Sequence, residues 1–183
     1  ASEWSWSATV MGHVERPVRR VASTRVGFDL YVSDPLGRAN AAVALGRPLP
    51  LPTLRDPVPA DALFATDTSG GLFDALENFR RVNPGMWIEV DCERAIAPDV
   101  RAVLPSGVEP GWTLVGGVGE YALVFAVPSE TAVREGIRIG RGGFKDGDAA
   151  AEIRLRANGR EGLLANRDCP LRINFERSVR SLV

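Results

Sequence analysis

Five prolines stand within residues 47–61 (RPLPLPTLRDPVPAD), and this segment constrains the fold more than any other feature of the sequence. Proline lacks a backbone N–H and clashes with the preceding helical turn, so the segment can form neither a regular helix nor a central strand. We expect an extended connector, partly in the polyproline II conformation, inside a single domain that covers residues 1–183. A proline-rich ligand for a partner domain is the alternative reading.

Short apolar strands and short helices alternate on both sides of this connector. Strand patterns occur at 4–14, 28–33, 62–66, 86–91, 120–127, 137–139, 151–155 and 171–175. Helical patterns occur at 37–45, 72–82, 93–104 and 130–135, and the glycine-rich segments 111–119 and 139–143 are expected to be turns. This alternation predicts an α/β (α+β) protein in which helices pack on a mixed β-sheet.

The charge composition excludes several functions. Lysine and arginine number 22 against 23 acidic residues, which gives a formal net charge of -1 and argues against nucleic acid and anionic membranes as partners. The arginines within residues 154–180 are expected to form a solvated face or a domain interface. No apolar run is long enough to span a membrane, and no secretory signal is visible, so a cytoplasmic protein is expected. Lys145 is the only lysine, and no P-loop motif is present.

The first candidate site is Asp67-Thr68-Ser69-Gly70-Gly71-Leu72, where an apolar strand runs into a helix. Free N–H groups and a partial positive charge at a helix N-terminus favour a phosphate group. We therefore expect Asp67, Ser69, Gly70 and Gly71 to bind phosphate or nucleotide, with Asp67 as a ligand of Mg²⁺. The structural alternative is an ordinary helix cap made by Ser69 or Asp67.

The second candidate site is the segment Gly116-Gly117-Val118-Gly119-Glu120-Tyr121, which precedes the strongest strand pattern in the chain. Glycines before a buried strand allow close backbone approach to a ligand. A tight hairpin turn would explain the same glycines without a ligand.

The order of these motifs resembles the C-terminal domain of the aminoimidazole ribonucleotide synthetase superfamily, especially its thiamine-monophosphate kinase branch. Residues 27–33 (GFDLYVS) followed by Pro35-Leu36-Gly37 resemble the opening of that domain. Asp67–Leu72 resembles the family's D-x-S-D-G-L, and residues 115–128 (VGGVGEYALVFAVP) resemble its S-G-G-E-D-Y-E-L-L-F-T-V-P. Ile139-Gly140-Arg141 resembles a late strand, so the matches are collinear over roughly residues 8–143.

The resemblance implies an ATP-dependent, Mg²⁺-requiring enzyme whose reactions include phosphorylation of thiamine phosphate. Gly116, Gly117, Glu120 and Tyr121 would then bind the substrate, a small-molecule phosphate acceptor. In this family the domain packs against an N-terminal ATP-binding domain that also makes the dimer, so a homodimer is possible. The chain starts at Ala1 without Met, and the resemblance places that residue at the domain junction. We therefore expect the ATP-binding domain to belong to the same gene or to a separate chain.

The sequence also departs from the family at acidic positions. Gly70, Gly119 and Ala122 replace carboxylates, and the proline segment 47–61 replaces a basic helical segment. Losing carboxylates removes groups that would hold Mg²⁺ and balance triphosphate charge. The catalytic residues stay unassigned, and two functions stay open. One is half of an ATP-dependent phosphotransferase or ligase-like enzyme; the other is a non-catalytic domain that binds a metabolite or has a structural role.

Overall fold

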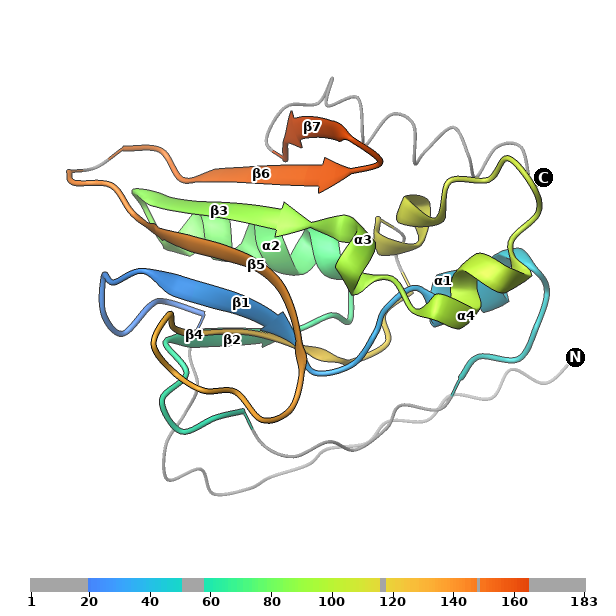
Figure 1. The fold of residues 1–183 in the computed structure, drawn as a ribbon, viewed down its shortest axis with the longest axis horizontal. Coiled ribbons are helices and arrows are strands. Elements are labelled where there is room, and N and C mark those ends of the chain that lie inside the picture. Colours follow the sequence, from blue (N-terminus) through green and yellow to red (C-terminus); the bar gives the residue numbers. More distant parts are fainter. Residues whose placement is uncertain (1–19, 51–57, 116–117, 148, 165–183) are drawn as a thin grey trace, which may run out of the picture.

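Seven strands form one mixed sheet in the order β2-β4-β1-β5-β3-β6-β7 (Figure 1). The computed structural model describes residues 20–50, 58–115, 118–147 and 149–164. The strands are β1 (Phe28–Val32), β2 (Phe64–Asp67), β3 (Met86–Asp91), β4 (Leu123–Pro128), β5 (Ile137–Phe144), β6 (Glu152–Ala157) and β7 (Arg160–Leu163). The mixed sheet with packed helices confirms the fold class that the sequence predicts.

The strand pairing is almost entirely non-local. β1 lies between β4 and β5 and is antiparallel to both, while β2 extends the sheet beyond β4. β3 runs antiparallel to β5 and parallel to β6. β6 and β7 alone are both consecutive in the chain and paired within this sheet, so the fold depends on pairings between distant segments.

Helix α2 (Leu72–Val82) lies across one face of the sheet, which we call the inner face (Figure 1). Alternation in β1 turns Phe28, Leu30 and Val32 toward this face, and all three are fully buried. The ring of Phe64 lies edge-on to Phe28 at 5.1 Å and to Phe79 of α2 at 4.7 Å. These aromatic contacts join the helix to the sheet in one apolar core.

The remaining helices gather beside the ends of β1 and β3 (Figure 1): α1 (Arg38–Ala44), α3 (Cys92–Ala95), α4 (Pro98–Val103) and the 3₁₀ helix η1 (Pro110–Leu114). The single helix expected over 93–104 is wrong, because Ile96 and Ala97 are extended between α3 and α4. Pro98 disfavours a helical conformation at Ala97. Leu36 also bridges this break, since its N–H donates to Ala95 O at 2.7 Å and its carbonyl accepts from Ala97 N at 2.8 Å.

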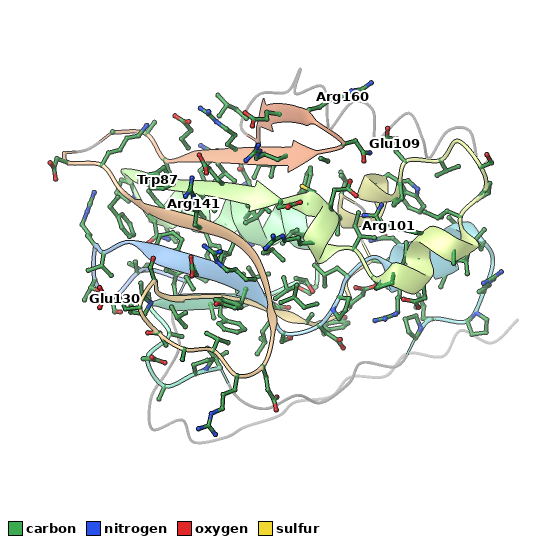
Figure 2. All side chains as sticks on the ribbon, in the orientation of Figure 1. Trp87, Arg101, Glu109, Glu130, Arg141 and Arg160 are labelled. Atoms are coloured by element: carbon green, nitrogen blue, oxygen red, sulfur yellow. The ribbon has the colours of Figure 1, made fainter. Side chains whose placement is uncertain are left out.

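The opposite face of the sheet, the outer face, has an apolar part and a charged part. Near β4 the rings of Tyr31 and Phe125 stack at 5.6 Å. Over β3 and β5, Arg141 pairs with Glu89 at 3.0 Å, and Trp87 lies on the same side (Figure 2). The charged part is therefore a solvated sheet face with cross-strand ion pairs.

Two further local predictions are wrong. Residues 139–143 are not a turn but part of β5, in which Gly140 lies against the Glu89 carbonyl and the other two glycines are covered by aromatic side chains. The Phe28 ring lies where a Cβ of Gly142 would be, and the Trp87 indole covers Gly143 in the same way. Residues 130–135 form no helix, since Val133 packs instead against the apolar cluster around Phe125.

The other expected elements fall into three groups. The strands at 28–33, 62–66, 86–91, 120–127 and 151–155 and the helices at 37–45 and 72–82 are confirmed with small shifts of their ends. Residues 47–50 and 58–61 of the connector contain no helix or strand, while 51–57 lie outside the described residues. The strands expected at 4–14 and 171–175 also lie outside them. Among the described helices, none has the length and apolar character needed to cross a membrane.

Candidate functional site

The two candidate segments meet at one edge of the sheet. Thr68 donates to the carbonyl oxygen of Ala122 from its backbone N–H at 2.9 Å and from its hydroxyl at 3.1 Å. Asp67, at the end of β2, pairs with Leu123 at the start of β4. Gly119 lies so close to the Thr68 and Ser69 carbonyls that a Cβ there would collide with both. The turn 67–71 and the segment 118–122 therefore form one surface; Gly116 and Gly117 lie outside the described residues.

The turn between β2 and α2 leaves the start of the helix without a side-chain cap. The cap position is Gly71, with φ of 86°, so neither Ser69 nor Asp67 caps α2 as the structural alternative supposed. The Asp67 carboxylate instead accepts a hydrogen bond from Ser69 N at 3.3 Å. Ser69 is exposed and Asp67 is partly exposed. Both side chains are thus accessible beside a helix N-terminus, where an anion is favoured.

Gly70 stands where the motif D-x-S-D-G-L, which this turn resembles, has an acidic residue. The side chain of Asp74 lies close to Gly70. A Cβ at residue 70 would lie 2.5 Å from Asp74 Oδ2 and 2.9 Å from its Cγ. Asp74 is in the first turn of α2, where a carboxylate interacts favourably with the helix dipole. Position 70 therefore has no carboxylate, but the carboxylate of Asp74 lies close to that position.

Glu120 is engaged by the backbone of α1. Its Oε2 accepts from Gly37 N at 2.8 Å, and its Oε1 accepts from Ala39 N at 2.6 Å. Burial raises the pKa of the Glu120 carboxyl, although these two hydrogen bonds oppose the shift. Both carboxylate oxygens thus have backbone donors, and the residue ties the site to α1.

Tyr121 is the exposed aromatic residue of the site. Its side chain is turned to solvent, with 62% of the residue exposed, and its φ is 58°. A positive φ is uncommon for a bulky non-glycine residue and carries a conformational cost. The neighbours Glu120 and Ala122 are both held by hydrogen bonds. The backbone therefore presents this ring between two anchored residues.

The described residues offer little for a metal ion by themselves. No group of three or more histidine, cysteine or acidic side chains within them could hold one. Asp67 is the accessible carboxylate of the turn 67–71. Mg²⁺ commonly binds through one or two carboxylates together with substrate phosphates. A single accessible carboxylate fits a Mg²⁺ ion that is also held by the phosphates of a nucleotide. It does not fit a metal ion that is held by protein side chains alone.

A hollow of about 450 Å³ opens on the outer face beside this surface. Leu123, the partner of Asp67 in the sheet, lines it together with Phe125, Val133 and Arg134. Its volume lies within the range that small-molecule sites occupy. The hollow therefore reaches the site through Leu123, and Asp67 is not among its lining residues.

Solved structures share this fold. Thiamine monophosphate kinase from Aquifex aeolicus matches with a TM-score of 0.59 and 22% identity over 82% of this chain and 56% of the kinase. AaThiL complexed with AMPPCP and TMP matches with a TM-score of 0.57 and 22% identity over 80% and 52%. HypE of E. coli, a hydrogenase maturation protein, matches with a TM-score of 0.55 and 20% identity over 78% and 50%.

These matches define the class of fold. The chain has the fold of the aminoimidazole ribonucleotide synthetase superfamily, as the resemblance of its motifs predicted. It spans about half the length of the solved proteins. No family model and no curated protein matches it in sequence.

The sequence interpretation missed one residue that the site depends on. Asn40 lies on α1 and is 7% exposed, and its side chain contacts the backbone of Thr113 and Val118. The alanine-rich helix pattern around it gave one signal, since a polar side chain among buried alanines needs a hydrogen-bonding partner. The identity of that partner depends on a contact more than seventy positions away.

Proposed function

We propose that this chain is the C-terminal part of an ATP-dependent phosphotransferase that resembles thiamine-monophosphate kinase. The observation that supports it is the contact between Thr68 and Ala122, which joins the turn 67–71 to the segment 118–122. The fold agrees, and one protein of that fold was solved with AMPPCP and TMP. The proposed partner is an ATP-binding domain of the same gene or of a separate chain. HypE, which shares the fold, has been solved in a complex with HypF.

In this proposal the turn 67–71 faces the nucleotide. Gly70 and Gly71 would let phosphate oxygens approach the backbone, and the Ser69 hydroxyl would donate to one of them. The Gly71 N–H itself donates to Thr68 O at 2.9 Å, so the backbone donors to phosphate would come from Gly70 and the start of α2. Asp67 would contact Mg²⁺ carried by the nucleotide. The metal would neutralise charge on the phosphates. Phosphoryl transfer depends mainly on positioning and electrostatic stabilisation, so this chain would orient the nucleotide and exclude water.

The acceptor would lie on the other side of the same surface. Gly116, Gly117 and Tyr121 would contact it, while Glu120 would hold their segment in place through α1. The hollow lined by Leu123, which directly follows this segment in the chain, gives space for a small molecule. A small phosphate acceptor such as thiamine phosphate is the substrate class that we propose.

A non-catalytic domain is the second candidate, and specific observations favour it. Both oxygens of Glu120 already accept backbone hydrogen bonds, so this carboxylate is committed to α1. Asp74 places a negative charge at the N-terminus of α2, where a phosphate would otherwise bind. In this alternative the chain binds a metabolite or has a structural role in a larger enzyme.

Calorimetry with Mg-ATP separates the two candidates. The phosphotransferase proposal expects binding that Asp67→Asn weakens by about tenfold or more, since a charge-assisted contact is lost. The matched control Asp61→Asn, on an exposed turn, should leave the affinity unchanged. Binding that does not depend on Asp67 supports the non-catalytic candidate. Because the proposal places ATP binding partly on a separate domain, absence of binding by this chain alone is decided by the turnover measurement below.

A turnover measurement completes the test. The chain is mixed with an ATP-binding domain of the resembling superfamily, and ATP consumption is followed with thiamine phosphate present. Stimulation that Asp67→Asn abolishes supports phosphoryl transfer. Equal rates with and without the chain would contradict it.

A further inference from the structure

Helix α1 and the segment that leads into β4 exchange side-chain hydrogen bonds. From α1, Asn40 Nδ2 donates to Thr113 O at 2.8 Å and to Val118 O at 3.0 Å. Asn40 Oδ1 accepts from Val118 N at 3.4 Å. In the other direction, Glu120 accepts from the N–H groups of Gly37 and Ala39. We call this reciprocal set of contacts, made by Asn40 and Glu120, the clasp.

The clasp lies in a mainly buried environment. Asn40 is 7% exposed and Thr113 is 2% exposed. The N-terminus of α1 also fits tightly here, because a Cβ on Gly37 would collide with the Thr113 hydroxyl. Buried polar groups that lose their partners are costly, so these hydrogen bonds hold the two segments together.

The segment 118–122 is held from a second side by the turn 67–71. Gly119 lies against the Ser69 carbonyl, and the Ala122 carbonyl accepts twice from Thr68. The residue between these anchors, Tyr121, keeps a φ of 58° and an exposed ring. Contacts on both sides thus oppose relaxation of this backbone to a commoner conformation.

We propose that Asn40 and Glu120 are positioning residues, which fix the backbone of residues 118–122 and so hold the Tyr121 ring at the ligand surface. The role of Tyr121 toward a ligand rests on the proposed function, whereas the fixing of the backbone does not. A ligand with a planar ring, such as thiamine phosphate, would bind more tightly if the Tyr121 ring is already held in position, because less conformational entropy is lost on binding.

Amide hydrogen exchange tests the fixing of the backbone. Asn40→Ala and Glu120→Gln should each speed exchange of residues 118–122 by about tenfold, as expected when hydrogen bonds of this strength are lost. Peptides from β1 and β3 should keep their wild-type rates. Asn78→Ala and Glu89→Gln, which change a partly exposed residue of α2 and an outer-face residue, are the matched controls. Unchanged exchange at 118–122, or faster exchange throughout the chain, would overturn the proposal.

Calorimetry with thiamine phosphate tests the action through Tyr121. Tyr121→Ala and Asn40→Ala should each weaken binding, and the double variant should bind no more weakly than Tyr121→Ala alone. Additive losses would mean that Asn40 acts independently of Tyr121, which contradicts its positioning role. Glu120→Gln repeats the measurement with a side chain of similar size.

The two proposals fail in different ways. If the wild-type chain does not bind thiamine phosphate, the proposed acceptor is contradicted. The position of the Tyr121 side chain is then measured by its nitration rate instead of by calorimetry. The positioning role expects the nitration rate of Tyr121 to change in Asn40→Ala and to stay constant in Asn78→Ala. A rate that is equal in both variants would overturn it.

Discussion

Gly119 lies directly against the backbone of Ser69, with no room for even a methyl group between them. This contact joins the segment before β4 to the turn before α2, and both segments carry residues of the candidate site. A larger residue at 119 would push the two segments apart. Glycine at position 119 is thus required by packing in this chain.

Gly119→Ala should destabilise the protein by about 1–3 kcal/mol, the usual cost of forcing extra volume into a tightly packed position. The matched control is Gly27→Ala, because the nearest atom to a Cβ there is Ser129 Oγ at 3.7 Å. That variant should stay within about 0.5 kcal/mol of wild type. Urea unfolding measures both, and equal stabilities of the two variants would contradict the packing at Gly119.

Gly70→Asp alone should not restore the acidic motif, because Asp74 occupies the neighbouring space. We expect this variant to lose stability, and Asp74→Ala to recover at least about 1 kcal/mol of that loss in the double variant. Glu77→Ala, one turn further along α2, is the control and should recover nothing. A double-mutant cycle in urea gives the coupling; additive effects would show that the two positions do not compete.

Stability should depend on the protonation of Glu120. Burial raises the pKa of this carboxyl, so the folded state binds its proton more readily than the unfolded state. The stabilisation is complete below the unfolded pKa and is lost as pH rises through the folded pKa. Relative to Glu120→Gln, wild type should therefore lose stability as pH increases across that window.

Glu152 provides a control of opposite sign. The side-chain hydrogen bond from Lys145 lowers the pKa of this carboxyl, and Arg154 contributes in the same direction. Its contribution is present above the unfolded pKa and is lost as pH falls through the folded pKa. Thermal melts of wild type, Glu120→Gln and Glu152→Gln across pH should give trends of opposite sign. The Glu152 effect should be small, because solvent screens the charges of this partly exposed ion pair. Parallel trends would contradict the assignment.

Asn83→Ala should be among the more destabilising polar substitutions. Asn83 is 3% exposed, accepts from Ala22 N at 2.8 Å, and donates to Arg20 O and Phe79 O at 2.9 Å each. Leaving these groups unpaired should cost about 1–3 kcal/mol. Asn78→Ala should cost less, because Asn78 on α2 is partly exposed and its side chain donates to Asp74 Oδ2 at a longer 3.4 Å. Chemical denaturation decides between them, and similar losses would contradict the role of Asn83.

Local periodicity was enough to predict some elements to the residue. Leu72, Leu76 and Phe79 repeat at helical spacing, and the helix spans 72–82 as expected. Alternation of Met86, Ile88 and Val90 similarly defined β3. In both segments the spacing of the apolar residues is enough to predict the element, so no knowledge of contacts with distant residues is needed.

Other elements depend on partners that the sequence does not reveal. The glycines of β5 are compatible with a strand only because Phe28 and Trp87 cover two of them. The segment 130–135 has a helical start signal, but six residues form a weak helix unless tertiary contacts support it. In the structure, Val133 instead packs against the apolar cluster that contains Phe125.

The candidate site shows the same division. The turn 67–71 stood out because its polar residues follow a strand and precede a helix. Asn40 did not stand out, because its role comes from hydrogen bonds to the carbonyls of Thr113 and Val118, which are distant in the sequence. The sequence predicted that Glu120 binds a substrate. Its hydrogen bonds to Gly37 and Ala39 could not be predicted, because only the folded chain brings α1 next to Glu120.

The order of strands has a consequence for synthesis on the ribosome. β1 ends at Val32, but the strands on either side of it, β4 and β5, begin at Leu123 and Ile137. At translation rates of about 5–20 residues per second, β1 waits on the order of 5–20 s for its neighbours. The apolar residues Phe28, Leu30 and Val32 stay without their sheet partners during that time. The nascent chain should therefore bind a ribosome-associated chaperone until β5 emerges, and its folding should be slow for its size.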